Sequence, residues 1–219
     1  MDPDLFDALT APDWDLALWL AMARTLGGPV LELGCGTGRV AQRLQQYGHA
    51  VFGVEHDPAL ARRAGRRIGH RRVWVGDVRG FKAAEPFPLV LIPCNMLSLF
   101  QDPLELLRVA SENPAPGGHL AFDLVVPEGR SWGEPPHRWV QEADGVRRGG
   151  DFDPETRTHR GWASSEGRHW AQTTFYPPLP SWPALLDQAG LRQVRQVDEG
   201  GRPPSPASRI AVVVARKAA

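Results

Sequence analysis

The chain has 219 residues, of which 42% are hydrophobic and 23% are charged, so it is long enough for one domain with a complete core. Its 25 basic and 25 acidic residues balance, which gives no electrostatic reason to expect a nucleic-acid partner. No apolar run approaches the roughly 20 residues of a membrane span, and the two cysteines form no disulfide framework. The acidic amino terminus lacks the pattern of a signal peptide, so we expect a cytoplasmic protein.

Helices and strands are expected to alternate over the first part of the chain. The first helix is centred on residues 14–22, with Thr10 or Asp13 as its cap, and it ends at Gly27. Apolar strands are expected over residues 30–33, 50–55, 73–77, 89–93 and 119–126. The helices expected between them cover residues 37–47, 58–68 and 102–112. This alternation predicts βαβ units and a mostly parallel sheet that is covered on both faces.

The pattern changes after the fifth strand. Residues 127–180 are rich in Gly, Pro, Trp and His, and their short alternating pieces indicate antiparallel strands. We interpret this segment as a substrate cap inserted into a single domain of residues 1–219, in which residues 1–28 form a helical lid. The remaining expected elements are a helix over residues 182–189, capped by Ser181, and strands over residues 192–197 and 209–216.

The most informative stretch joins the first strand to the next helix. Glycine stands at every second position of residues 34–38, and Glu32 precedes the first glycine by two residues. Such a loop lets a ligand lie directly against the backbone. A dinucleotide fingerprint has the spacing G-x-G-x-x-G, and an acid before the loop would repel a phosphate but attract an ammonium group. The loop therefore favours a zwitterionic ligand without phosphate.

Acidic residues also end the next two strands. Glu55 ends the second strand, where a carboxylate can accept hydrogen bonds from both ribose hydroxyls. Asp77 ends the third strand, where a carboxylate can accept from an exocyclic amine. In an open α/β sheet, ligands bind beyond the carboxyl ends of the strands, so these acids and the glycine loop are expected to converge. Together they describe a nucleoside joined to an amino acid, which is S-adenosylmethionine.

Residues 30–40 resemble motif I of the class I S-adenosylmethionine-dependent methyltransferases. Residues 52–58, 76–81 and 114–123 are similar to the ribose-binding strand end, the adenine-binding turn and the fifth strand of that family. The resemblance covers nearly the whole chain. It implies a Rossmann-like, doubly wound, seven-stranded and mostly parallel α/β sheet with an antiparallel last strand and an antiparallel β cap inserted after strand five. It also implies an enzyme that converts S-adenosylmethionine to S-adenosylhomocysteine.

The resemblance assigns roles to residues at the strand ends. Glu32 and the glycine loop would hold the methionine end, Glu55 the ribose, and Asp77 the adenine. The expected cofactor-binding residues are Trp14, Glu32, Gly34, Cys35, Gly36, Gly38, Glu55, His56, Asp77, Val78, Asn95 and Met96. Simpler roles remain open for some of them: Glu55 as a solvated acid, Asp77 as a turn former, His56 as a packing residue and Asn95 as a cap.

The insertion holds aromatic residues with polar tips, which suit the lining of a small-molecule pocket or the anchoring of a small sheet. They are Trp132, His137, Trp139, Trp162, His169, Trp170 and Tyr176. Residues 92–97 lack the Asn/Asp-Pro-Pro-aromatic pattern of enzymes that methylate amino groups of nucleic acids. A metal-dependent catechol-type site needs several acids near strands four and five, where only Asp123 is obvious, so we predict no metal.

Methyl transfer from a sulfonium is an in-line displacement, which needs a base only when the nucleophile starts protonated. The candidate catalytic or substrate-anchoring residues are Asn95, Asp123, His137 and Tyr176. We expect the acceptor to be an N or O nucleophile of a small molecule, and the protein to be a monomer or homodimer without membrane or nucleic-acid partners. Two alternatives stay open: a non-catalytic S-adenosylmethionine-binding protein, and a methyltransferase acting on a protein or RNA.

Overall fold

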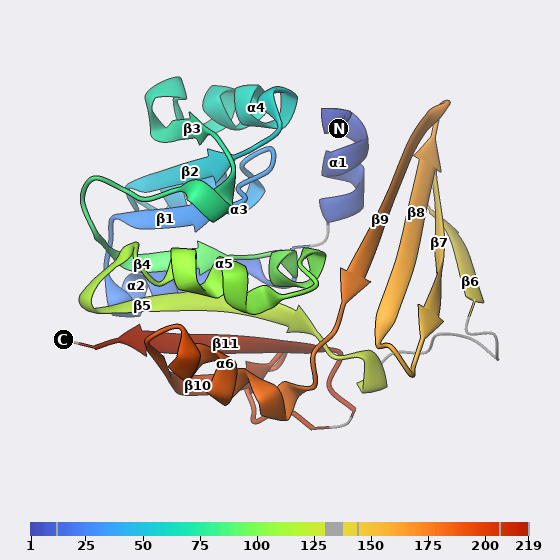
Figure 1. The fold of residues 1–219 in the computed structure, drawn as a ribbon. Helices are drawn as coiled ribbons and strands as arrows, with labels where there is room; N and C mark the ends of the chain where they lie inside the picture. Colours follow the sequence, from blue (N-terminus) through green and yellow to red (C-terminus); the bar gives the residue numbers. More distant parts are fainter. Residues whose placement is uncertain (12, 130–137, 144, 206, 219) are drawn as a thin grey trace.

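The computed structural model describes residues 1–11, 13–129, 138–143, 145–205 and 207–218. These residues form a seven-stranded sheet, here called sheet A, and a separate four-stranded sheet, called sheet B. Figure 1 shows sheet B standing beyond the carboxyl ends of the sheet A strands, with helix α1 between the two. Among the helices of these ranges, none has both the length and the apolar character that a membrane crossing requires.

Sheet A has the strand order β10-β11-β5-β4-β1-β2-β3. Strands β1 to β5 are mutually parallel, and β11 is antiparallel to both of its neighbours, β5 and β10. The strands are β1 Val30–Leu33, β2 Val51–Glu55, β3 Val73–Val75, β4 Phe87–Ile92, β5 Pro114–Val125, β10 Leu191–Asp198 and β11 Ile210–Lys217. The Rossmann-like, mostly parallel sheet with an antiparallel last strand is therefore confirmed.

Helices cover both faces of sheet A. The α-helices are α1 Pro3–Thr10, α2 Leu16–Leu26, α3 Arg39–Gln46, α4 Pro58–Ile68, α5 Pro103–Ala110 and α6 Trp182–Gln188. Short 3-10 helices are η1 His70–Arg72, η2 Val78–Gly80, η3 Met96–Leu99, η4 Pro127–Gly129 and η5 Leu179–Ser181. Trp19 of α2 and Leu44 of α3 pack in the core on one face, while Leu107 of α5 and Trp182 of α6 pack on the other. Burial on both faces explains the continuous apolar strands.

Sheet B is the antiparallel insertion expected after β5. Its strands, in the order β6-β7-β8-β9, are β6 Arg138–Ala143, β7 Val146–Asp153, β8 Thr158–Ser165 and β9 Arg168–Phe175. Val146 and Ala163 of this sheet form a small buried cluster with Leu5 of α1. Sheet B is thus attached to the rest of the protein partly through the N-terminal helix.

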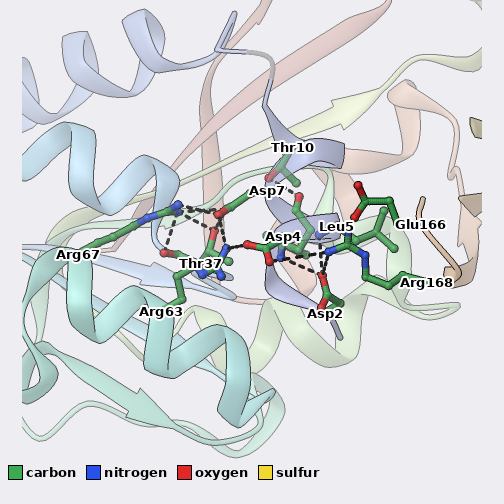
Figure 2. A network of polar contacts seen from close by, with 11 residues as sticks. Asp2, Asp4, Leu5, Asp7, Thr10, Thr37, Arg63, Arg67, Glu166 and Arg168 are labelled. Atoms are coloured by element: carbon green, nitrogen blue, oxygen red, sulfur yellow. Dashed lines mark hydrogen bonds and ion pairs between the residues drawn. The ribbon is translucent and has the colours of Figure 1, made fainter. Parts of the chain in front are cut away.

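Helix α1 bridges the two sheets through ion pairs, which Figure 2 draws from close by. Arg63 and Arg67 of α4 donate to the Asp7 carboxylate at 3.0 and 2.7 Å. Arg168 of β9 donates to Asp2, the N-cap of α1, at 3.1 Å. Helix α1 is therefore fixed at both ends, to the covering layer of sheet A and to sheet B.

The N-terminal helices begin elsewhere than the sequence predicts. Residues 3–10 form a separate helix, whose N-cap Asp2 accepts from two backbone N–H groups. The expected caps Thr10 and Asp13 are both wrong, because the N-cap of α2 is Asp15. The Thr10 hydroxyl instead donates to the Phe6 carbonyl within α1 at 2.9 Å.

Two other expectations near turns need correction. Ser181 is the N-cap residue of α6, as expected, but its side chain makes no capping hydrogen bond; its hydroxyl donates to the Pro178 carbonyl at 2.7 Å. Strand β5 begins at Pro114, five residues earlier than residue 119, because Pro114 already pairs with Phe87 of β4 across a register shift. The Pro- and Gly-rich run thus belongs to an irregular strand end, although its composition is typical of a turn.

Asp7→Asn is expected to loosen α1, because it removes the charge that pairs with Arg63 and Arg67. Hydrogen exchange of the backbone amides of residues 4–10 should accelerate about tenfold, which corresponds to ~1.4 kcal/mol for a partly exposed ion-pair network. The matched control is Glu112→Gln, which removes one exposed ion pair with Lys82 far from α1. Equal exchange in both variants would contradict the bridging role of Asp7.

Candidate functional site

A cavity of about 970 Å³ lies at the carboxyl ends of the sheet A strands. The strand order reverses between β1 and β4, and open α/β sheets bind their ligands at such a reversal. Residues of α1, of the turns after β1, β2 and β4, of β5 and of β9 line the cavity. The expected cofactor-binding residues in this lining are Trp14, Gly34, Glu55, His56, Asp77, Val78, Asn95 and Met96. The volume suits a small-molecule site.

The glycine turn after β1 is held against side chains from two other segments. Gly34 has φ +71°, and a Cβ built on it would lie 1.9 Å from the Met96 sulfur. Gly36 has φ +56°, and a Cβ there would lie 2.5 Å from the Phe6 ring of α1. Both the positive φ and the close contacts require glycine, so the turn presents bare backbone beneath Phe6 and Met96.

Four expected cofactor residues lie outside the cavity lining, and three of them have packing contacts in or next to the glycine turn. A Cβ at Gly38 would lie 3.1 Å from the Ala64 Cα, so this glycine lets α3 approach α4 closely. The Cys35 side chain is buried beside Gly53 of β2, and burial raises the pKa of its thiol, which keeps it neutral. Gly36 itself is covered by Phe6.

Glu55 at the end of β2 is tied to the glycine turn. It is only 4% exposed, and its Oε2 accepts from the Gly36 N–H at 2.9 Å. Its Oε1 accepts from the Asp57 N–H at 2.9 Å and lies 3.0 Å from His56 Nδ1. The ring of His56 is 79% exposed. Because each carboxylate oxygen can accept more than one hydrogen bond, Glu55 retains acceptor capacity for hydroxyl groups in the cavity.

Asp77 follows β3 and lies half exposed at the cavity edge. Its carboxylate receives hydrogen bonds from the Arg79 guanidinium at 2.5 to 3.1 Å and from the Arg79 backbone N–H at 2.9 Å. These bonds hold the pKa of Asp77 below its usual value, so the group is an anion at neutral pH. Val78 beside it is buried and opens η2.

Asp123 of β5 is a buried carboxyl in the cavity wall. It is 2% exposed, and its Oδ2 accepts from the Asn95 N–H at 3.0 Å, while Oδ1 has no hydrogen-bond partner among the described residues. Burial, the largest cause, raises its pKa to about 7. Both polar atoms of the Asn95 side chain are bonded, since Oδ1 accepts from the Val125 N–H and Nδ2 donates to the Ser98 hydroxyl. Asn95 therefore fixes the loop that positions Asp123.

An ion pair that the sequence analysis missed lies next to Asp123. The two terminal nitrogens of Arg39 donate to the two oxygens of Asp15, each at 2.7 Å, and Trp19 Nε1 donates to the same carboxylate at 2.9 Å. Arg39 also lies 3.1 Å from the sulfur of Cys94. Arg39 directly follows the last glycine of the loop, which is the only local sign of its role. Its partner stands 24 residues earlier, and no local pattern connects the two.

Glu32 lies behind the cavity. The alternation of β1 places its side chain with Val30 on the face covered by α2 and α3, and it is not part of the lining. It is 2% exposed, and its Oε2 has no partner among the described residues. Burial raises its pKa to about 8. Any influence of Glu32 on a ligand therefore acts through the residues in front of it.

The candidate residues of the cap separate into three groups. His169 and Trp170 of β9 line the cavity. Tyr176 is buried outside the lining, with its hydroxyl 2.9 Å from that of Thr174, and Trp162 lies under Arg147. Trp132 and His137 lie outside the described residues, and so does the side chain of Trp139. Within the described ranges, no three His, Cys, Asp or Glu side chains gather closely enough to hold a metal ion.

Comparisons with known proteins agree with this geometry. Residues 30–118 match the family model described as a methyltransferase domain. The chain is 32% identical over 130 residues to the cypemycin N-terminal methyltransferase of a Streptomyces species, covering 57% of this chain and 53% of that protein. It is 28% identical over 111 residues to the ubiquinone biosynthesis O-methyltransferase of Nitrosospira multiformis, covering 47% and 45%. The chain thus spans about half the length of these curated relatives.

Among solved structures, the methyltransferase CcbJ from Streptomyces caelestis superposes with a TM-score of 0.80 at 24% identity, over 94% of this chain and 97% of that one. At this identity the likeness establishes the fold, which extends over sheet B as well as sheet A. The family match covers the segment that carries the glycine turn and the acid-ended strands. Residues 30–118 thus match a methyltransferase domain, and the chain has the fold of a solved methyltransferase.

Proposed function

We propose that the protein transfers the methyl group of S-adenosylmethionine to an N or O nucleophile of a small molecule by in-line displacement. One observation carries the proposal furthest. A single cavity is lined both by Gly34, Glu55 and Asp77, which suit the methyl donor, and by Asp123 and Trp170, which suit an acceptor. Donor and acceptor would therefore share one cavity, as a direct transfer requires.

The residues at the strand ends fit the cofactor. The bare backbone at Gly34 and the thioether of Met96 suit the methionine end. The buried Glu55 carboxylate has acceptor capacity for the ribose hydroxyls, and the Asp77 anion suits the exocyclic amine of adenine. The exposed His56 ring lies beside the ribose acid, at the rim of the cavity.

When bound, S-adenosylmethionine supplies a methyl group on a positively charged sulfur. The protein has to align the acceptor with that group and to exclude water. Phe6 and Trp14 from the N-terminal segment and Trp170 from sheet B line the cavity with apolar surface. Asn95 positions the loop between donor and acceptor through its bonds to Asp123 and Val125.

We assign lid and cap roles to the two segments that flank the cavity within a single domain. Residues 1–28 serve as the lid, because α1 places Phe6 on the glycine turn and is fixed through Asp7 to α4. Residues 127–180 serve as the substrate cap, because β9 contributes His169 and Trp170 to the cavity. The ion pairs of α1 thus hold one wall of the cavity in place.

Replacing Gly34 by Ala is expected to abolish binding of S-adenosylhomocysteine, because the added Cβ meets the Met96 sulfur and disfavours φ +71°. Isothermal titration calorimetry should show at least a 100-fold loss of affinity. Gly48→Ala is the matched control: its φ is +88°, but nothing lies within 4 Å of the added Cβ. A wild-type protein that binds NAD but neither S-adenosylmethionine nor S-adenosylhomocysteine would overturn the cofactor assignment.

Glu55→Gln is expected to weaken S-adenosylhomocysteine binding about 10- to 100-fold, because one acceptor oxygen of the proposed ribose site becomes a donor. Free adenosine should lose affinity by the same factor, since it carries the same ribose. The control is Glu105→Gln on the exposed side of α5. Unchanged dissociation constants for both ligands would show that Glu55 serves only the glycine turn.

Methyl transfer can be followed with S-adenosylmethionine that carries an isotopically labelled methyl group. Incubation with fractionated cell extract should place the label in the small-molecule fraction. Label in the protein or RNA fraction would favour the alternative of a macromolecular acceptor. If S-adenosylhomocysteine binds but no fraction acquires label, the protein is better described as a non-catalytic S-adenosylmethionine-binding protein.

A further inference from the structure

The carboxyl group of Asp123 is the part of the cavity whose chemistry the cofactor does not explain. It lies near the carboxyl end of β5, on the face of sheet A that α2 and α3 cover. One oxygen is fixed by the Asn95 N–H, and the other has no partner among the described residues although it is buried. A buried carboxyl oxygen without a partner is costly, so a ligand group that donates a hydrogen bond is expected there.

The basic side chain beside Asp123 is already paired with another acid. Arg39 is the nearest basic group, but both its terminal nitrogens bind the two oxygens of Asp15. That pair is neutral as a unit and cannot also neutralise Asp123. Trp14 and Trp170 add aromatic surface to the same cavity. An unpaired carboxylate together with aromatic walls favours a positively charged organic ligand.

We infer that the methyl acceptor is an amine, which binds as an ammonium ion to the free oxygen of Asp123 and gives its proton to that carboxylate before it attacks. This inference rests on the proposed methyltransferase function and adds the class of acceptor and the proton acceptor. Asn95 acts as a positioning residue, because its backbone N–H holds the second oxygen of Asp123 in place.

The step balances without any further reactant. The ammonium N–H bond breaks and its proton moves to Asp123 Oδ1, which leaves a neutral amine. The amine lone pair forms the new N–C bond, the C–S bond breaks, and its electron pair stays on sulfur to give the neutral thioether. The methylated amine leaves with a positive charge, and Asp123 returns its proton to water when the products depart.

The environment of Asp123 makes this proton transfer feasible. An alkyl ammonium has a pKa of about 10, and an ordinary Asp about 3.9, so the transfer would be unfavourable by about 10⁶. With the pKa of Asp123 raised to about 7, the same transfer is unfavourable by only about 10³. Loss of a proton from an aliphatic hydroxyl or a phenol would instead leave an anion beside Asp15. The nearby Arg39 would not neutralise that anion, because it is already paired with Asp15.

The same groups set the direction of the pH dependence. The charged or titratable residues that face Asp123 are Asp15 of the α2 cap, which raises its pKa, and Arg39 of α3, which lowers it. The Cys94 thiol also lies in this region, 3.1 Å from the Arg39 guanidinium, and lines the cavity. His169 of β9 lines the same cavity. Only ionised Asp123 can accept a proton, so kcat/KM, which reports the free enzyme, should rise with pH through about 7.

Binding of small probes tests the inference without turnover. Calorimetry on the complex with S-adenosylhomocysteine should show benzylammonium binding at least tenfold more tightly than benzyl alcohol. Asp123→Asn should remove this preference, whereas Asp187→Asn on the exposed side of α6 makes the same charge change and should keep it. Equal binding of the two probes, or an unchanged preference in Asp123→Asn, would overturn the inference.

Turnover provides the second test, with a panel of amines and their matched hydroxyl analogues and with mass spectrometry to locate the methyl group. Amines should be the acceptors, and Asp123→Asn should lower kcat about 10²- to 10⁴-fold and abolish the rise near pH 7. Near pH 10 the variant should recover, because the amine is then neutral in solution. Asp187→Asn should match the wild type throughout.

The outcomes separate this inference from the proposed function. Methylation of hydroxyl analogues alone would leave the methyltransferase proposal standing and refute the amine. If Asp123→Asn weakens S-adenosylhomocysteine binding as strongly as it lowers kcat, the carboxylate holds the cofactor and the inference is wrong. If the wild type binds neither the donor nor the product and transfers no methyl group, the proposed function fails, and the amine inference fails with it.

Discussion

The buried ion pair between Asp15 and Arg39 is the interaction on which the cavity depends. It joins the start of α2 to the helix that follows the glycine turn, and Trp19 adds a third hydrogen bond from the core. Asp15 is 1% exposed, and removing one partner of such a pair leaves an uncompensated buried charge that costs about 3 to 5 kcal/mol. The pair therefore fixes the N-terminal segment on the glycine turn. It also occupies the nearest cation, which leaves Asp123 without one.

The cofactor side of the cavity could be predicted from the sequence because its geometry follows from strand direction alone. Parallel strands bring their carboxyl ends to one edge, so a glycine turn after β1 and acids after β2 and β3 must converge there. Glu55 and Asp77 both line the cavity, as this reasoning requires. The same reasoning does not predict the position of the Glu32 side chain, because strand alternation places it under α3.

The rest of the site depends on contacts between residues far apart in the chain. The sequence does not distinguish α1 from α2, because the contacts that hold α1 are distant in the chain. Asp7 pairs with Arg67, 60 residues away. Asp2 pairs with Arg168, 166 residues away. The composition of residues 127–180 predicts antiparallel strands but not which face meets α1. The packing of Leu5 of α1 against Val146 and Ala163 of sheet B shows which face this is. Long-range charge and packing, unlike strand periodicity, leave no local pattern.

Two buried acids on this face of sheet A, Glu32 behind the cavity and Asp123 in its wall, differ in their protonation. At pH 7 the pKa of about 8 keeps most Glu32 neutral, so it contributes little negative charge. The pKa of about 7 leaves Asp123 divided between its two forms. A cation in contact would stabilise the ionised form and lower that pKa, whereas a neutral ligand would favour the protonated form. Asp123 can thus be ionised while the acceptor is a cation and protonated after the acceptor has given up its proton.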